Sequence, residues 1–233
     1  MKFYIMACLC FMIGLEAKSA FINGNELGNG GDAISCDNGQ DFFYDAYEAE
    51  FRFGMKPQFP QGIDEYEIAK KVVARFEGVS DMRARAYIKW IEEFPEDSQF
   101  LDNIELIDIP DTNSGFIPAR CHIRQLLIQR TPKFPGEKRF AINNDLWRRL
   151  SIEHRAAAIV HEMLLREGRI NEHQTSENIR NLNAYLLSGK ISQFRIQKNW
   201  VSFLQKVIQF KFSDFDGIWI DLIPGQPLEF DEL

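Results

Sequence analysis

Residues 161–167 read His-Glu-Met-Leu-Leu-Arg-Glu within an apolar helical pattern, and a His-Glu pair in this setting suggests a metal site. In the zinc-peptidase motif H-E-x-x-H, two histidines four residues apart share one helix face, and the glutamate polarises a zinc-bound water. Here Leu165 occupies the second histidine position, and Asn171 stands where the longer motif has its third ligand. Because leucine cannot bind zinc, the motif is not intact.

Other side chains offer an alternative ligand set. His161, Glu162 and His173 would form a three-ligand zinc site if the chain after the helix folds back on it. His154 lies seven residues from His161, about 10 Å along a helix, which is too far for both to bind one ion. This set predicts a divergent metal-dependent hydrolase with His161 and Glu162 as its catalytic residues.

The same helix also has a structural interpretation, which the pattern favours. Glu162 precedes Arg166 by four residues, the favourable order for an ion pair on a helix surface. His161 borders the apolar side, where a neutral imidazole with one or two hydrogen bonds is common. Under this interpretation the chain binds no metal and has no other cofactor.

Glu167 falls on the apolar face of this helix, where an unpaired carboxylate would cost several kcal/mol. We therefore expect a buried ion pair between Glu167 and an arginine. Arg180 is the partner we predict, with Arg148 and Arg149 as alternatives.

The remaining elements must position these residues. Apolar residues recur at helical spacing in five segments. Pro95 is expected to end the second of these helices, and Gly168 the third. The five predicted helices span residues 66–76, 81–94, 151–167, 176–188 and 200–207.

Strand-like runs are short and lie in blocks. Asn38-Gly39 predicts a hairpin between residues 33–36 and 41–47, and further strands are expected within 121–129 and 139–142. The acidic and aromatic stretch 41–50 indicates a strand with one solvated face, or else a carbohydrate- or partner-binding surface. The pattern predicts an α+β fold, with small antiparallel sheets or hairpins packed on a cluster of about five helices.

The first twenty residues predict export. Lys2 precedes an apolar run from Phe3 to Ile13, and small residues follow, so we expect a signal peptide cleaved after Ser19 or Ala20. Residues 21–32 are rich in Gly and Asn and indicate a flexible leader, and 33–233 are expected to form a single α+β domain. No later segment predicts a membrane span, so we expect a periplasmic or secreted protein.

The net charge and the cysteine content limit the classes of partner and of chemistry. The 233 residues carry a formal charge of −7, and an acidic chain argues against a nucleic-acid partner. Removing residues 1–20 takes away two lysines and one glutamate, which changes the charge from −7 to −8. It also leaves Cys36 and Cys121, which we expect to form one disulfide in an exported chain. A bonded sulfur is no nucleophile, which argues against thiol catalysis by Cys121 beside His122.

Short motifs follow one another in a fixed order over most of residues 28–190: Gly30-Gly31-Asp32 before Cys36, Cys121, Gln125-Leu126, Gln129-Arg130, Asp145-Leu146-Trp147, His161-Glu162, Arg166-Glu167, Ser176 to Arg180, and Asn183. In these motifs the chain resembles a family of uncharacterised exported proteins of predatory bacteria. This resemblance implies export, suggests that the two cysteines belong together, and makes Leu165 an ordinary apolar position. It brings no catalytic residues with it.

The sequence therefore predicts an exported binding or interaction module without catalysis, acting on a protein or cell-envelope partner. The metal-dependent hydrolase, with zinc, is the alternative. A third class, a carboxylate-pair hydrolase of wall glycans, stays open, because no pair can be identified among the acidic residues without geometry.

Overall fold

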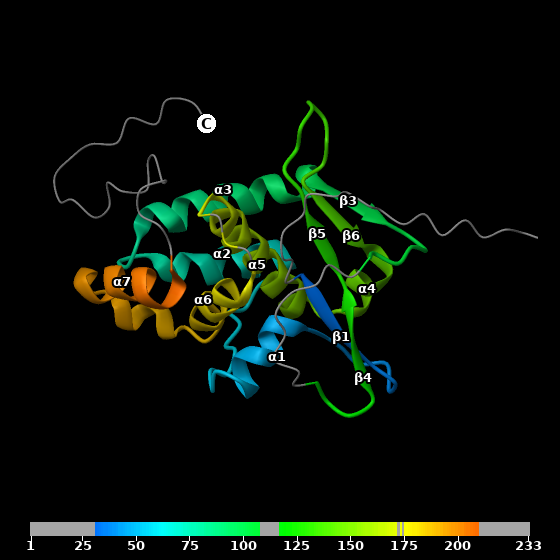
Figure 1. The fold of residues 1–233 in the computed structure, drawn as a ribbon, viewed down its shortest axis with the longest axis horizontal. Helices are drawn as coiled ribbons and strands as arrows, with labels where there is room; N and C mark the ends of the chain where they lie inside the picture. Colours follow the sequence, from blue (N-terminus) through cyan, green and yellow to red (C-terminus); the bar gives the residue numbers. More distant parts are fainter. Residues whose placement is uncertain (1–30, 108–116, 172, 174, 210–233) are drawn as a thin grey trace, which may run out of the picture.

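The computed structural model describes residues 31–107, 117–171, 173 and 175–209 (Figure 1). The helices are α1 (Tyr44–Phe51), α2 (Glu65–Val73), α3 (Asp81–Asp97), α4 (Asn144–Arg149), α5 (Ile152–Ile170), α6 (Glu177–Leu187) and α7 (Gln197–Phe203), with short turns η1 (Ala74–Phe76), η2 (Lys190–Phe194) and η3 (Leu204–Ile208). The strands are β1 (Asp32–Cys36), β2 (Asp41–Phe43), β3 (Ser98–Leu101), β4 (Cys121–Gln125), β5 (Leu127–Gln129) and β6 (Phe140–Asn143).

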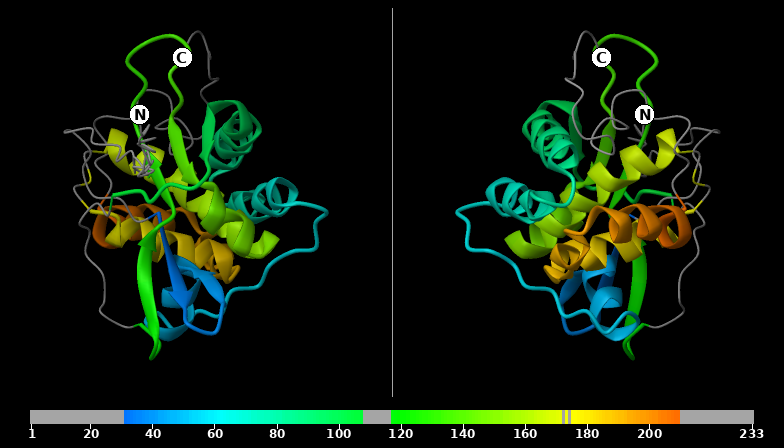
Figure 2. Two further views of the ribbon diagram at one scale, coloured as in Figure 1. Left: turned by 90° about the vertical axis from the view of Figure 1, so that its right-hand side faces the viewer. Right: turned by 90° about the vertical axis from the view of Figure 1, so that its left-hand side faces the viewer.

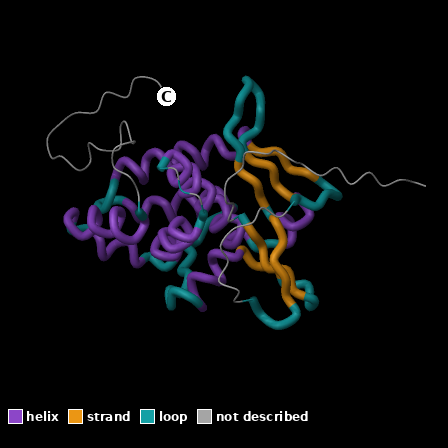
Figure 3. Tube along the Cα trace, viewed as in Figure 1, coloured by secondary structure: helices purple, strands orange, loops and turns teal. Residues whose placement is uncertain are grey.

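These elements confirm the α+β class, with strands gathered on one side of the molecule and most helices on the other (Figure 3). One three-stranded sheet has the order β2-β1-β4 and is antiparallel throughout. The other has the order β3-β6-β5, and its β3–β6 pair is parallel, unlike the antiparallel sheets that were predicted. A long connection between β3 and β6 makes the parallel pairing possible.

The predicted hairpin forms around Asn38-Gly39, and the predicted disulfide lies beside it. Cys36 at the end of β1 is directly opposite Cys121 at the start of β4, and their sulfurs are bonded. The second hairpin strand is shorter than expected, because the chain becomes helical at Tyr44. Buried residues recur there at positions 45, 48 and 49, which is the spacing of a helix rather than a strand.

The two sheets share one bent run of chain, because only Leu126 separates β4 from β5. The carbonyl oxygen of Gly31 accepts hydrogen bonds from the N–H groups of Leu126 and Leu127, at 2.9 and 3.0 Å. A Cβ on Gly31 would lie 2.6 Å from the Leu127 carbonyl oxygen, so the junction requires glycine. The predicted flexible leader 21–32 is wrong at its end, since Asp32 already belongs to β1; residues 1–30 lie outside the described part.

Helix α5 is central, and packs against α1, α2, α3, α6 and β2. The side views place α1 and the β1–β2 hairpin at one end of the molecule and α3 at the opposite end (Figure 2). The hydrophobic core runs through both sheets and the helices, and small residues of α5 such as Ala157 lie within it. α5 therefore reaches from the hairpin end to the α3 end.

Two predicted helix ends are wrong. α3 continues through Pro95 to Asp97, where the missing N–H costs a single bond in the last turn. α5 continues through Gly168 to Ile170. A Cβ on Gly168 would lie 2.7 Å from the Ile179 side chain, so this glycine permits close packing of α6 rather than ending the helix.

Candidate functional site

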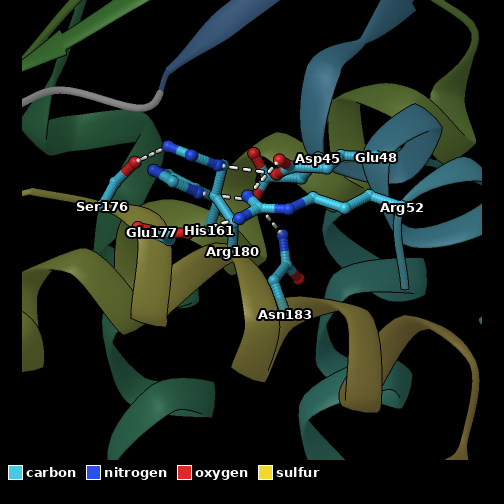
Figure 4. A network of polar contacts seen from close by, with 8 residues as sticks. All are labelled: Asp45, Glu48, Arg52, His161, Ser176, Glu177, Arg180 and Asn183. Carbon is cyan, nitrogen blue, oxygen red and sulfur yellow. Dashed lines mark hydrogen bonds and ion pairs between the residues drawn. The ribbon is translucent and has the colours of Figure 1, made fainter. Parts of the chain in front are cut away.

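His161 takes part in a buried polar network between α5, α1 and α6 (Figure 4). Its Nδ1 lies 2.7 Å from Oδ2 of Asp45, and the side-chain amide of Asn183 donates to the same oxygen at 2.8 Å. Since a carboxylate only accepts, His161 donates through Nδ1. All three side chains are enclosed by protein, so no substrate can reach them.

Glu48, one turn further along α1, extends this network towards α6. Its Oε2 accepts from Nε of Arg180 at 2.7 Å, and its Oε1 accepts from Arg52 at 2.8 Å. Arg180 also donates to the hydroxyl of Ser176 at 2.5 Å, and Arg52 also contacts Glu177 (Figure 4). The inward carboxylates of α1 thus fix this helix to α5 and α6.

The charge of His161 is set by two opposing effects. Burial disfavours the imidazolium, but the negative charge of Asp45 and its hydrogen bond outweigh this, so the pKa of His161 is raised. Its Nε2 is buried and has no hydrogen-bond partner in the described part. The His161 ring is therefore held by one hydrogen bond, and its raised pKa favours the imidazolium over the neutral ring that the structural interpretation expected.

Glu167 does form a buried ion pair, but the predicted partner is wrong. Arg83 of α3 donates to its carboxylate at 2.7 and 3.0 Å, and the hydroxyl of Tyr87 bonds the other oxygen. Arg180 instead pairs with Glu48 on another side of α5. The partner of Glu167 is decided by α3, which packs on this face of α5.

The predicted surface pair between Glu162 and Arg166 is also wrong. Glu162 is fully buried, and neither carboxylate oxygen has a hydrogen-bond partner in the described part. Burial raises its pKa to about 7, against the lowering effects of His161 and Arg169. Arg166 lies over the ring of Trp90, 4.2 Å from its centre.

The alternative zinc ligands are not gathered in one place. His161 and Glu162 are buried, whereas Nε2 of His173 lies 3.3 Å from the carbonyl oxygen of Gln209. Within the described residues, no group of three or more His, Cys, Asp or Glu side chains is arranged to hold a metal ion. The donor geometry therefore gives the hydrolase alternative no support.

A pocket of about 840 Å³ lies at the hairpin end, with the Cys36–Cys121 disulfide in its wall. The hairpin turn forms one side and α1 another, while residues 56–59 and 118–121 complete it. The sequence gives no local signal for this pocket, since its walls come from distant segments.

The pocket combines aromatic rings with charged groups. Four aromatic side chains line it: Phe42, Tyr47, Phe51 and Phe59. Four exposed charged side chains also line it, and none of them forms an ion pair within the described part: Asp37, Glu50, Lys56 and Arg120. Such a mixture of apolar surface and unengaged polar groups is typical of a binding site.

His154 contributes a hydrogen-bond donor to the pocket. Its Nδ1 accepts from the N–H of Phe43 at 3.1 Å, and its ring packs edge-to-face on Phe42. Burial lowers the pKa of His154, so the ring is neutral at pH 7. With Nδ1 accepting, the proton lies on Nε2, which has no hydrogen-bond partner among the described residues.

The buried network and the pocket use opposite faces of the same helix. Asp45 and Glu48 of α1 point into the network, whereas Tyr47, Glu50 and Phe51 line the pocket. The predicted solvated strand at 41–50 is therefore wrong for Asp45 and Glu48, which are buried. Their spacing of three residues, followed by Ala49, was the signal that could have identified an inward helix face.

Comparisons with known proteins found no matching family model, no matching curated protein and no matching solved structure.

Proposed function

We propose that the protein is an exported binding module that holds a ligand in the pocket beside the Cys36–Cys121 disulfide, without catalysis. The pocket itself carries this proposal, because it brings aromatic rings, among them the exposed ring of Phe51, into one concave place with charged side chains that form no ion pair among the described residues. The groups that suggested catalysis, His161 and Glu162, are enclosed by protein instead.

The buried network supports binding by positioning the pocket. Asp45 and Glu48 of α1 contact His161 and Arg180, and these buried contacts hold the helix in place against α5 and α6 without a ligand. A preformed site loses less conformational entropy on binding. We therefore assign to the buried network the role of positioning the side chains of α1 that line the pocket.

Export is part of the proposal. A disulfide is typical of oxidising compartments, namely the periplasm or the outside of the cell. None of the described helices combines the length and the apolarity that a membrane crossing requires. The predicted signal peptide and the resemblance to exported proteins of predatory bacteria support the same compartment, and a cell-envelope partner.

The experiment is a calorimetric titration of the oxidised protein with four named probe classes: neutral tetrasaccharides, phenylalanine-containing tetrapeptides, inorganic phosphate and decanoate. We expect one class to bind saturably, and Phe51→Ala in the pocket to weaken this binding roughly tenfold or more. Phe134→Ala is the matched control, since Phe134 is 73% exposed, against 57% for Phe51, and lies outside the pocket. Absence of binding, or binding that Phe51→Ala leaves intact, would overturn the proposal.

The hydrolase alternative is tested by zinc analysis of the purified protein. If the protein contains one zinc ion per chain, and both His161→Ala and Glu162→Gln lose it, the hydrolase hypothesis is favoured and the binding module is rejected. The second variant keeps the test valid if His161→Ala does not fold.

A further inference from the structure

We infer that the ligand of this pocket is a short neutral oligosaccharide. This inference rests on the proposed function and adds the chemical class of the ligand. Four features of the pocket carry it: the aromatic pair on α1, the balance of donors and acceptors, the blocked edge of β2, and the size of the pocket.

The aromatic pair provides a stacking surface. Tyr47 and Phe51 are four residues apart on α1, and their ring centres lie 4.3 Å apart. Phe51 is 57% exposed, so part of its ring surface faces solvent in the pocket. The C–H bonds of a sugar ring carry partial positive charge, and the faces of aromatic rings are negative, so a sugar stacks well on this pair.

The polar groups match hydroxyls. A hydroxyl both donates and accepts, so a sugar needs donors and acceptors together. Lys56 and Arg120 donate, Asp37 and Glu50 accept, and Nε2–H of His154 adds a neutral donor. All line the pocket, and their charges cancel.

This charge balance argues against ionic ligands. A phosphate or another polyanion selects a surplus of cationic groups, and a cationic ligand selects a surplus of carboxylates. The pocket has two of each kind. A fatty-acid chain would require an apolar enclosure, which the four charged side chains do not provide.

The blocked edge of β2 argues against a peptide. β2 is an edge strand, and an extended peptide would pair with its free backbone groups. The N–H of Phe43, at the end of β2, is already bonded to Nδ1 of His154. A peptide strand would lose this donor in a strand of three residues.

The size of the pocket indicates more than one sugar unit. Its volume of about 840 Å³ lies in the upper part of the range of about 300–1,000 Å³ for small-molecule sites. A monosaccharide would leave much of it empty. We therefore expect affinity to increase from monosaccharide to tetrasaccharide.

The experiment is calorimetric titration with glucose-, mannose- and N-acetylglucosamine-based tetrasaccharides and with each monosaccharide. At least one tetrasaccharide should bind more tightly than its monosaccharide, with a Kd that is unchanged across a roughly tenfold range of salt. Tyr47→Ala and Phe51→Ala should each weaken binding roughly tenfold or more, which is about 1.4 kcal/mol. Phe134→Ala should not change the Kd.

A second variant pair tests the polar contacts. Glu50→Gln removes a charged acceptor of the pocket, and we expect it to weaken tetrasaccharide binding. Glu77→Gln alters an exposed glutamate that does not line the pocket, and should have no effect.

The outcomes separate the two proposals. If the tetrapeptide, phosphate or decanoate binds at Phe51 and no saccharide does, the ligand class is wrong while the binding module stands. If none of the probes binds, both proposals fail. Saccharide binding that Tyr47→Ala and Phe51→Ala leave intact would overturn the assignment to this pocket.

Discussion

His161 and Asp45 are separated by 116 residues in sequence, yet Nδ1 of one lies 2.7 Å from Oδ2 of the other. This contact joins α5 to the buried face of α1, and the opposite face of α1 carries the aromatic pair of the pocket. A substitution on the buried face of α1 should therefore also shift the aromatic pair that lines the pocket.

Glu48 and Glu50 lie two residues apart on α1, but replacement by alanine should lower the free energy of unfolding strongly at Glu48 and hardly at all at Glu50. Glu48→Ala leaves Arg180 buried without its carboxylate, which costs about 3–5 kcal/mol for a buried ion pair. Glu50→Ala removes an exposed side chain and should stay within about 0.5 kcal/mol. Urea unfolding of both variants measures the difference, and equal effects would contradict the network as drawn in Figure 4.

Glu162 should make the protein less stable as the pH rises. Its pKa is about 7 in the folded protein and 4.5 in its ordinary state, so between these values the unfolded chain releases a proton that the folded chain retains. The contribution of Glu162 to stability is therefore largest below pH 4.5 and falls by about 3 kcal/mol up to pH 7.

The test is Glu162→Gln, whose side chain is uncharged at every pH. Between pH 4.5 and 8, the stability of this variant in urea unfolding should fall less with rising pH than that of the unsubstituted protein. His161 and Asp45 remain in both proteins, but the charge of Glu162 also raises the pKa of His161, so the difference between the two profiles reports Glu162 together with its coupling to His161. Parallel profiles would show that the carboxylate is not held in the dry environment described.

The disulfide should stabilise the fold and protect both sulfurs. Cys36 and Cys121 are separated by 85 residues, and closing such a loop is worth about 4–5 kcal/mol in the chain-entropy model. The double variant Cys36→Ala, Cys121→Ala should therefore have a free energy of unfolding that is lower by about 4–5 kcal/mol. A thiol probe should label neither residue in the native, non-reduced protein, and labelling of both would refute the bond.

Gly31 and Gly168 should tolerate alanine differently. A Cβ on Gly31 would meet a backbone carbonyl oxygen at 2.6 Å, and we expect a cost of about 1–3 kcal/mol. A Cβ on Gly168 would meet the end of the Ile179 side chain, which can rotate, and alanine gains about 1 kcal/mol of helix propensity. Thermal unfolding of both variants should therefore show the larger loss for Gly31→Ala.

The features predicted correctly from sequence depend on neighbouring residues or on a small choice of partners. Asn38-Gly39 predicts its own turn, and Ser151 accepts a hydrogen bond from the N–H of His154 at the start of α5. Two cysteines left after residue 20 allow only one pairing. The α+β class follows from apolar periodicity in the same local way.

The features predicted wrongly depend on which segments pack together. Glu167 was expected to need an arginine, and it has one, but Arg83 reaches it because α3 packs there. Glu162 was placed on the surface by its spacing to Arg166, whereas the sheet junction at Gly31 covers it. Periodicity shows that a helix has a buried face, but not which element buries it.

The residue pattern alone predicts most of the helices, though not α1, together with the hairpin turn, the disulfide and the need of Glu167 for a buried cation, because each follows from local geometry or from charge burial. The packing of distant segments decides that Asp45 meets His161, that the carboxylate of Glu162 has no hydrogen-bond partner among the described residues, and that a pocket forms beside the disulfide. The physical reason is that these contacts join segments dozens of residues apart, and their geometry is set by the packing of α1, α3 and α6 on α5.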